Sequence, residues 1–563
     1  MTPKIAIIGS GPTGIYTLKG LALARTPTDI TVFEAEGDPG KGTPYHPDIN
    51  DPAMLANIAS IEFPPICEPL VAWLVRQDDD TLARLRVRRD AIDEREFYPR
   101  VVLGEYMKAQ FEQLCRIAVE NGHTITVRPN NRVLDIALQP DDIRLTVEEA
   151  GGSEHLDFAF EHVVMATGHN WPENTEIKPG YFVSPWPAAA LKVIQNCPVA
   201  ILGTSLSGID ALMTVATAHG TFYLDAAGQL QYQPAPDTED FHATMMSRKG
   251  LLPEADFYCE VPYLPPVYCT EDAIDASIAT GATGLLDRVF ALFKEELSHA
   301  DPDYAARIGL SQLTVETLAP AYFADRAEVD PFAWAGRNLM EAEQNKTQKY
   351  TVPWRYSILR MHEIIARAVP HLNEDDLKRF HRYFKTVFVD NYATVPHASI
   401  QRLLALHRAN KLEIAALGDE YDIRTDGVKT GVVISHHGED HAYGAFIDAT
   451  GQSSLSARDL PFPTLVAQGG VRESATAKAV TWLDVEADVE IVRTGGIDLD
   501  DRFRPLQTGN LSNRLYCAAI SFLLHKLPFV QGITSARDIG EVVAAAIIED
   551  VDATEAPMLQ ASA

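Results

Sequence analysis

The sequence predicts an α/β protein with two parallel sheets and a helical insertion. Two glycine-rich loops predict the sheets: residues 9–14 follow an apolar strand at 4–8, and residues 203–208 follow an apolar strand that starts at Pro198. Residues 284–410 have a helical pattern interrupted by prolines, which predicts the insertion. A strand, a glycine-rich loop and a helix in this order are typical of a Rossmann-like dinucleotide-binding domain. Two such domains in one chain indicate two dinucleotides and hydride transfer between them.

The first loop has the glycine spacing that a dinucleotide pyrophosphate requires. Gly9 permits the tight turn, Gly11 lets the backbone approach the phosphates, and Gly14 lets the following helix pack close to the strand. The N-terminus of that helix, expected at 12–24, favours phosphate through its dipole and its N–H groups. The expected cofactor contacts in this loop are Gly9, Gly11, Pro12, Thr13 and Gly14.

Glu34 ends the next predicted strand, at 30–34, twenty residues after Gly14. A carboxylate at this position accepts hydrogen bonds from a ribose diol and repels a 2′-phosphate. The first domain is therefore expected to bind FAD or NAD rather than NADP. The alternative is a glycine-rich turn without a ligand, but the strand, loop, helix, strand and acid all fall in the expected order.

The second loop differs from the first at two places. Gly203 and Gly208 flank Ser205, which replaces the middle glycine and is small enough for a close approach to phosphate. A strand is expected at 243–248, and the ribose of the dinucleotide should lie at its end. Ser247 and Arg248 occupy that end, and Lys249 follows them. A hydroxyl and cations suit a 2′-phosphate, so this domain is expected to bind NADPH. A solvated Arg-Lys pair at a strand end is the alternative.

Each loop is followed, later in the chain, by a predicted strand that ends in Ala-Thr-Gly. The first of these ends is Ala166, Thr167 and Gly168, and the second closes on Gly451. The order of loop, Ala-Thr-Gly, loop and Ala-Thr-Gly predicts an NADPH domain inserted within an FAD domain. The predicted segments are the first FAD segment 1–185, the first NAD(P)H segment 186–283, the helical insertion and candidate substrate lid 284–410, the closing NAD(P)H segment 411–452, the closing FAD segment 453–550, and a disordered tail 551–563.

Further elements follow from hydrophobic periodicity. The pattern predicts an amphipathic helix at 104–121, a small antiparallel sheet at 124–149, a last strand at 515–520 and a last helix at 533–548.

Composition limits the classes of function. The formal net charge of −30 disfavours nucleic acid and anionic membranes as partners. No apolar stretch is long enough to span a membrane, and no signal peptide is evident, so a cytoplasmic protein is expected. The six cysteines include no Cys-x-x-Cys pair, which argues against a metal site and a disulfide-reductase centre. The oligomeric state stays open.

Six sequence blocks carry a resemblance to a known family. They are MLANIASIE at 54–62, ATGHNWP at 166–172, GTSLSG at 203–208, LPEADFYC at 252–259, TVPWRY at 351–356 and PFVQG at 528–532. Together they resemble the bacterial YdhS-like family of FAD/NAD(P)-binding proteins, over residues 4–548, within the wider group of two-dinucleotide flavoproteins. The resemblance implies FAD and NADPH as cofactors. A more distant similarity to nitrosuccinate synthases, which N-oxidise aspartate with FAD and NADPH, implies an amine or amino-acid substrate.

The chain departs from the wider flavoprotein pattern in its last strand. That pattern has Gly-Asp, whose carboxylate holds the flavin ribityl chain, where this chain has Cys517–Ala519. The last helix, starting near Gly532 and Ile533, remains suited to the flavin edge. Asn57 is a candidate for the isoalloxazine edge and Arg100 for the FAD pyrophosphate. A turn-stabilising asparagine and a surface salt bridge are equally good interpretations.

Four residues are candidate substrate contacts. Arg355 and His362 lie seven residues apart on one predicted helix, so they share a face that could bind a carboxylate. His525 and Lys526 precede the last helix and could meet an anionic substrate. Solvated surface charges are the more frequent explanation for both pairs. Catalytic residues are not identified by the sequence, and no metal site is expected.

These observations favour an FAD-dependent oxidoreductase that takes hydride from NADPH. The lack of redox cysteine pairs, iron–sulfur motifs and haem motifs favours O₂ as acceptor, hence a monooxygenase that hydroxylates a small molecule through a flavin hydroperoxide. One alternative is a reductase that passes electrons to a quinone or a protein carrier. The other is a non-enzymatic flavin-binding protein.

Overall fold

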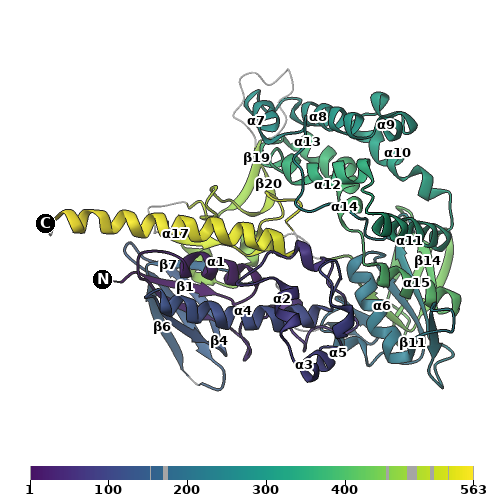
Figure 1. The fold of residues 1–563 in the computed structure, drawn as a ribbon, viewed down its shortest axis with the longest axis horizontal. Coiled ribbons are helices and arrows are strands. Elements are labelled where there is room, and N and C mark those ends of the chain that lie inside the picture. The colour runs from purple at the N-terminus through teal and green to yellow at the C-terminus, as the bar shows by residue number, and fades with distance from the viewer. Residues whose placement is uncertain are drawn as a thin grey trace. The chain divides into compact units, whose positions relative to one another are not determined.

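The computed structural model describes residues 2–152, 154–168, 175–451, 455–477, 491–507, 513–530 and 532–561. The chain forms two compact units: unit 1 contains 1–46, 58–170 and 453–563, and unit 2 contains 47–57 and 171–452. Each unit has a mostly parallel sheet with helices packed on it (Figure 1). The predicted α/β fold is confirmed. No helix in the described ranges is both long and apolar enough to cross a bilayer.

Unit 1 is built on a five-stranded parallel sheet in the order β21-β7-β1-β2-β3. Its strands are β1 (Lys4–Ile8), β2 (Asp29–Phe33), β3 (Thr124–Arg128), β7 (His162–Met165) and β21 (Leu515–Cys517). Strand β3 pairs in register with β2, so it belongs to the parallel sheet rather than to the antiparallel sheet predicted for 124–149. That antiparallel sheet consists of β4 (Asn131–Leu138), β5 (Ile143–Glu149) and β6 (His155–Phe160).

The helices of unit 1 pack on its two sheets and on one another. The helices are α1 (Pro12–Ala22), α2 (Leu70–Val75), α3 (Asp79–Arg84), α4 (Arg100–Glu120), α16 (Pro463–Ala467) and α17 (Ile533–Ala561), and a hairpin is formed by β19 (Glu473–Ala477) and β20 (Ile491–Ile497). Helix α17 lies along α1 (Figure 1), because glycines at Gly20 and Gly540 let the two helices approach closely.

Helix α17 also continues past Asp550, where a disordered tail was predicted. The reason is tertiary: Val551 is buried, the hydroxyl of Tyr516 donates to Asp550, and the hydroxyl of Thr26 donates to Asp552 at 2.6 Å. These tertiary contacts keep the segment after Asp550 helical, although its polar composition predicts disorder.

Unit 2 is built on a six-stranded sheet in the order β14-β13-β10-β18-β9-β8, in which only β8 is antiparallel to its neighbour. Its strands are β8 (Glu176–Lys178), β9 (Tyr181–Phe182), β10 (Pro198–Leu202), β13 (His242–Ser247), β14 (Leu412–Ala416) and β18 (Ala445–Asp448). Strand β9 pairs with β18, and Phe182 lies in the core of this unit. Residues 175–185 therefore belong with the second sheet, not with the first FAD segment as predicted.

Smaller elements complete the sheet-containing part of unit 2. They are α5 (Ala188–Leu191), α6 (Leu206–His219), the hairpin β11 (Gly220–Leu224) and β12 (Leu230–Pro234), and the three-stranded sheet β15 (Tyr421–Arg424), β16 (Val432–His436) and β17 (Glu439–Tyr443). Residues 47–57 also pack in this unit, since Ala188 donates to Ile49, Lys192 pairs with Asp51 and Arg402 donates to Ala53.

The helical region of unit 2 begins earlier than the predicted residue 284. Its helices are α7 (Glu271–Ala279), α8 (Leu285–Ala300), α9 (Pro302–Arg307), α10 (Val315–Ala327), α11 (Pro331–Gln348), α12 (Pro353–Ala366), α13 (Glu374–Arg379), a π-helix at Phe380–Phe384, α14 (Lys385–Tyr392) and α15 (His397–Arg408). Pro302, Pro331 and Pro353 each occupy a first helical position, so these prolines begin helices. Phe290, Phe293 and Phe384 form an edge-to-face aromatic core.

Candidate functional site

The first glycine-rich loop joins β1 to α1 in unit 1. Gly9 has φ +104° and its N–H donates to Phe33 at 2.8 Å. A Cβ atom on Gly9 would lie closer than 3.0 Å to the carbonyl oxygen of Ala166, and one on Gly14 would lie equally close to that of Gly9. Gly11 is less confined, because its Cβ would meet only the Cα of Gly42, at 3.3 Å. Gly9 and Gly14 thus shape the loop, and Gly11 keeps its outer face open.

Glu34 reaches back from the end of β2 to this loop. Its Oε2 accepts hydrogen bonds from the Ser10 N–H at 3.1 Å and the Ser10 hydroxyl at 2.6 Å. Its Oε1 accepts the Glu36 N–H at 3.2 Å. The carboxylate is only partly buried. Glu34 therefore fixes the loop and places an acceptor at the tip of β2, the position of a ribose diol.

A buried lysine beside the first loop was missed by the sequence analysis. Lys41 is 4% exposed and its ammonium pairs with Asp38 at 2.6 Å and with Glu105 at 2.8 Å. Burial alone would lower the pKa of Lys41, but the two carboxylates raise it, so the group stays charged. The adjacent Gly42 packs against Gly11. The Gly-Lys-Gly sequence at 40–42 was the available signal.

The other predicted FAD contacts are distributed over unit 1 and the 47–57 segment. Arg100 is the first residue of α4, and Gly532 has φ +90° directly before α17. Gly168 has φ +69°, and its carbonyl accepts the Ser521 hydroxyl at 3.1 Å. The Oδ1 atom of Asn57 is buried and has no hydrogen-bond partner among the described residues. Such an orphaned acceptor fits a donor on a bound ligand. The block at 169–172 lies outside the described residues.

The second glycine-rich loop, between β10 and α6, repeats the construction of the first. Gly203 has φ +128°, and its Cβ would lie closer than 3.0 Å to the carbonyl oxygen of Ala449. The Cβ of Gly208 would meet the carbonyl oxygen of Gly203 in the same way. Ser205 is the N-cap of α6 and makes no capping hydrogen bond. Each loop therefore packs against the alanine of an Ala-Thr-Gly strand end, and Gly451, with φ +96°, follows in open space.

A basic turn occupies the end of β13, next to the second loop. The N–H of Gly250 donates to the hydroxyl of Ser247 at 3.1 Å, so Arg248 and Lys249 are the two central residues of a tight turn. The Thr204 hydroxyl also lies 3.2 Å from that of Ser247, which ties the turn to the loop. Arg248 is 58% exposed and lies 3.8 Å from Asp419. A guanidinium is thus available where the ribose end of a dinucleotide is expected.

The structure gives Arg355 and His362 a role other than the predicted substrate contact. The Arg355 guanidinium is buried against the Glu254 carboxylate. Burial lowers the pKa of His362, whose ring packs against Tyr392 at 5.3 Å. The shared helix face was predicted, and in the structure it points into unit 2 rather than toward solvent.

Glu254 is the centre of a buried ion network. It faces Arg326 at 3.6 Å and accepts the indole N–H of Trp334 at 2.9 Å, while Arg326 also pairs with Asp390 at 2.5 Å. Burial alone would raise the pKa of Glu254, but Arg355 and Arg326 lower it to about 2. The network joins the segment after β13 to α10, α11, α12 and α14. It fixes the helical region to the six-stranded sheet of unit 2.

His525 and Lys526 are likewise part of the fold. The ammonium of Lys526 donates to the carbonyl oxygens of Leu499 at 3.2 Å and Asp500 at 3.3 Å. The His525 ring packs against Gly496, and burial lowers its pKa to about 4, so it is neutral near pH 7. Neither residue presents a free charge to an anionic substrate.

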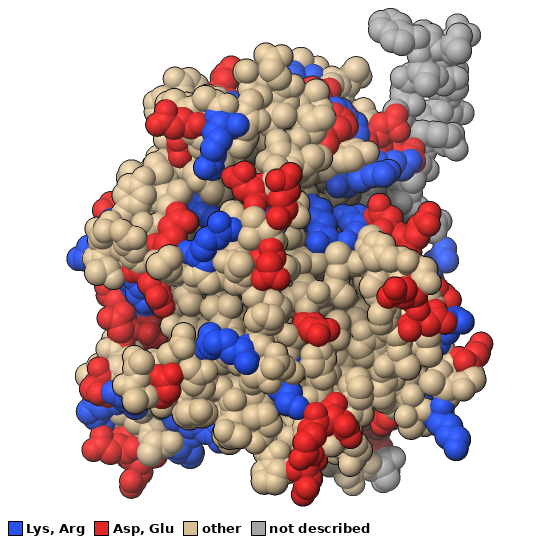
Figure 2. Space-filling model, turned by 90° about the vertical axis from the view of Figure 1, so that its right-hand side faces the viewer, with Lys and Arg blue, Asp and Glu red and all other residues tan. Residues whose placement is uncertain are grey.

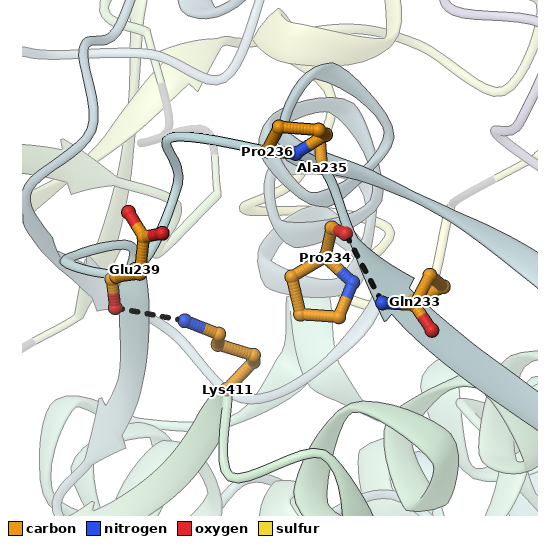
Figure 3. A pocket seen from close by; sticks show the side chains of 6 residues that line it. All are labelled: Gln233, Pro234, Ala235, Pro236, Glu239 and Lys411. Carbon is orange, nitrogen blue, oxygen red and sulfur yellow. Dashed lines mark hydrogen bonds between the residues drawn. The ribbon is translucent and has the colours of Figure 1, made fainter.

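One described pocket lies at the end of the unit 2 sheet that is opposite to the second glycine-rich loop. It is lined by Gln233, Pro234, Ala235, Pro236, Glu239 and Lys411 (Figure 3). Glu239 and Lys411 precede β13 and β14, so the pocket lies at the amino ends of these strands. The ammonium of Lys411 already donates to the carbonyl oxygens of Thr238 and Glu239. Dinucleotides bind at the carboxyl ends of such strands, so this pocket lies at the other end of the sheet from the second glycine-rich loop.

Charge on the face drawn in Figure 2 is mixed. Lys and Arg side chains are separated by acidic and uncharged ones, without a continuous basic surface. In the described part of the chain, no three His, Cys, Asp or Glu side chains group as a metal ion would require.

Comparison with known proteins adds two kinds of match. A family model described as FAD-NAD(P)-binding matches residues 6–170, and one described as a YdhS-like middle domain matches residues 270–392. The protein YdhS of Escherichia coli (strain K12) is 41% identical over 548 residues, which cover 97% of each chain.

Solved structures match at lower identity. The ornithine N-hydroxylase of Kutzneria sp. 744 is 13% identical with a TM-score of 0.49, covering 98% of this chain and 100% of that one. The thioredoxin reductase of Lactococcus lactis is 12% identical with a TM-score of 0.39, covering 97% of each chain.

Proposed function

We propose that this chain, which belongs to the YdhS-like family of FAD/NAD(P)-binding proteins, is a flavoprotein oxidoreductase that takes hydride from NADPH and acts as a monooxygenase on a small molecule. One observation carries the proposal. Two glycine-rich loops of the same construction stand at the carboxyl ends of two parallel sheets, with an acid at the ribose end of one and cations at the ribose end of the other.

The first loop fits FAD. Gly9 and Gly14 shape the turn, Gly11 and the start of α1 offer backbone N–H groups to the pyrophosphate, and Glu34 offers an acceptor to the adenosine ribose. When bound, FAD accepts a hydride from a reduced nicotinamide and delivers electrons to a second acceptor.

The second loop fits NADPH. Gly203, Ser205 and Gly208 form the pyrophosphate cradle, and the exposed guanidinium of Arg248 offers two parallel donors to a 2′-phosphate. The weak pairing with Asp419, 3.8 Å away and largely exposed, leaves Arg248 available. Ser247 holds the turn and contributes its hydroxyl to the same place.

The cysteines support a small acceptor such as O₂. None of the six cysteines, all within the described residues, forms a disulfide, and burial raises the pKa of Cys269 and Cys517 to about 12. Thiols with so high a pKa are poor nucleophiles, which disfavours these two cysteines as partners in disulfide exchange. The distant similarity to aspartate N-oxidising enzymes supports an amine or amino acid as the substrate. A reductase that uses a quinone is the second candidate.

The test is anaerobic stopped-flow absorbance of the flavin-loaded protein mixed with NADPH or NADH. We expect fast bleaching of the flavin band with NADPH and slower bleaching with NADH. In Arg248→Ala the preference for NADPH should fall by about 30-fold, because a charged phosphate hydrogen bond is lost. Arg307→Ala, which removes an exposed guanidinium from α9, is the matched control and should keep the preference.

Two outcomes would contradict the proposal. No bleaching with either nucleotide would favour a non-enzymatic flavin-binding protein. Reduction of a quinone without O₂, at the full rate and with no oxygenated product from amines or amino acids under air, would favour the reductase.

A further inference from the structure

Lys249, the second cation of the basic turn, has an unusual position. Its ammonium lies 3.4 Å from the ring centroid of Phe323 on α10. Among the described residues, no carboxylate lies within salt-bridge distance of this ammonium, in contrast to Arg326 and Arg355 deeper in unit 2. Lys249 is thus a cation held by an aromatic ring and without a counter-ion in the part of the chain that the structure describes.

The ring under Lys249 is itself held in place. Phe323 is 7% exposed, and the guanidinium of Arg326 lies 5.1 Å from its centroid. Arg326 in turn pairs with Asp390 and faces Glu254. Two cations therefore share one aromatic ring, and the inner one is fixed by the buried ion network. The helical region supplies a rigid support for the outer cation, Lys249.

Arg248 and Lys249 point to different supports from one turn. Arg248 faces Asp419 on the loop after β14, while Lys249 faces Phe323 on α10. The turn itself is fixed by the hydrogen bonds from Gly250 to Ser247. An anion placed at the tip of this turn would meet two cations, Arg248 from an exposed ion pair and Lys249 from its position over the Phe323 ring.

We propose that Lys249, held by Phe323, is a second cation for the terminal 2′-phosphate of NADPH, so that the helical region takes part in choosing the nucleotide. The inference rests on the proposed function, because it concerns the same nucleotide. The lysine N–H groups that face away from the ring are free to donate to phosphate oxygens. Phe323 acts as a positioning residue, since it holds the ammonium near the turn before the ligand arrives.

The same arrangement gives nucleotide binding a pH signature. Burial and the nearby cations Arg248 and Arg326 lower the pKa of Lys249 to about 8, and Asp390 opposes this in part. A phosphate dianion would raise that pKa again. Lys249 is then charged in both states near pH 7, but above pH 8 binding must first restore its proton. Affinity for a 2′-phosphate should therefore fall by about tenfold between pH 7 and pH 9.

The test uses two fragments of the nucleotide, 2′,5′-ADP and 5′-AMP, titrated calorimetrically into the flavin-loaded protein. Lys249→Met keeps the apolar stem and should lower the affinity for 2′,5′-ADP by about tenfold at pH 7, because the charged hydrogen bond is lost. Phe323→Leu keeps an apolar cover and should weaken it by about threefold, through the lost ring. Neither variant should change 5′-AMP binding. Lys346→Met, which removes an exposed lysine from α11, is the matched control.

The pH dependence provides a readout that a merely structural role would not move. The loss of 2′,5′-ADP affinity between pH 7 and pH 9 should disappear in Lys249→Met and persist in Lys346→Met. Unchanged 2′,5′-ADP binding in Lys249→Met and Phe323→Leu, with binding still dependent on Arg248, would overturn this inference and leave the proposed function standing. No discrimination between the two fragments by the wild-type protein would overturn the assignment of NADPH itself.

Discussion

The two glycine-rich loops are built alike, but the residues beyond them are opposite in charge. In both loops the first glycine packs on the carbonyl of an alanine, Ala166 or Ala449, and the last glycine packs on the carbonyl of the first. At the end of the neighbouring parallel strand, however, the first loop has Glu34 and the second has Arg248, the residues that the proposed function assigns to the two riboses. The shape of each loop thus depends on its glycines and backbone, as in any dinucleotide-binding loop. The choice between nucleotides is expected to depend on one or two side chains at the end of the neighbouring strand.

The two ribose ends also differ in what supports them. Glu34 is supported locally, by hydrogen bonds from Ser10 within its own loop. The basic turn of unit 2 is supported from a distance, by Phe323 and by the ion network around Glu254. The comparison shows one site completed by neighbouring sequence and another completed by a helical region inserted after it.

The largest effects are expected from the last glycine of each loop. Gly14→Ala should weaken FAD binding by about 100-fold, because the new Cβ would overlap the carbonyl of Gly9. Gly208→Ala should leave the flavin bound but weaken NADPH by a similar factor, for the same reason at Gly203. The ratio of flavin to protein absorbance and the NADPH dependence of flavin bleaching measure the two effects separately.

The control is Gly336→Ala on α11, where a Cβ meets open space. Alanine is favoured over glycine in a helix, so this variant should gain up to about 1 kcal/mol of stability and keep both nucleotides. If Gly14→Ala reduced NADPH binding instead of FAD binding, the assignment of the two cofactors to the two loops would have to be exchanged.

A substitution of Glu254 tests whether the buried ion network stabilises unit 2 without affecting the first glycine-rich loop. Glu254→Gln should lower the free energy of unfolding of unit 2 by about 3 kcal/mol at pH 7, because Arg326 and Arg355 would be buried without their shared carboxylate. The pKa of Glu254 is lowered to about 2 in the folded protein, so its stabilising contribution is present above the ordinary value of 4.5. That contribution is lost as the pH falls from 4.5 toward 2.

Chemical denaturation at pH 7 and at about pH 3 measures this difference. The difference in free energy of unfolding between wild type and Glu254→Gln should be smaller at the lower pH. Glu295→Gln, which changes an exposed glutamate on α8, should not alter the free energy of unfolding at either pH. A variant that unfolds like wild type at pH 7 would show that the helical region is not held by this network. Loss of flavin in the variant would instead tie the network to the first site.

The loops could be predicted from sequence because they are local. Gly9, Gly14 and Glu34 lie within one strand–helix–strand unit, and their spacing alone places them together. Arg355 could not be placed in this way. Its partner Glu254 precedes it by a hundred residues, so only the folded chain shows that the predicted helix face is buried.

Loop residues escaped prediction for a related reason. Lys41 carries no periodic signal, yet folding buries it between Asp38 and Glu105. Phe323 was one apolar residue among many in a helical pattern, and only the structure shows the ammonium of Lys249 over its ring. Long-range pairing of charges and rings is therefore the part of the site that sequence patterns do not contain.

The smallest effect is expected from Asp419, the loose partner of Arg248. Asp419→Ala should tighten NADPH binding by about twofold, because an exposed ion pair at 3.8 Å holds the guanidinium only weakly in competition with phosphate. Binding of NADH should not change, since it lacks the 2′-phosphate. Calorimetric titration at low and high salt measures the effect, which should vanish at high salt. Weaker NADPH binding in Asp419→Ala would instead show that this carboxylate orients Arg248 for the nucleotide, which would make the second ribose end, like the first, dependent on an acid.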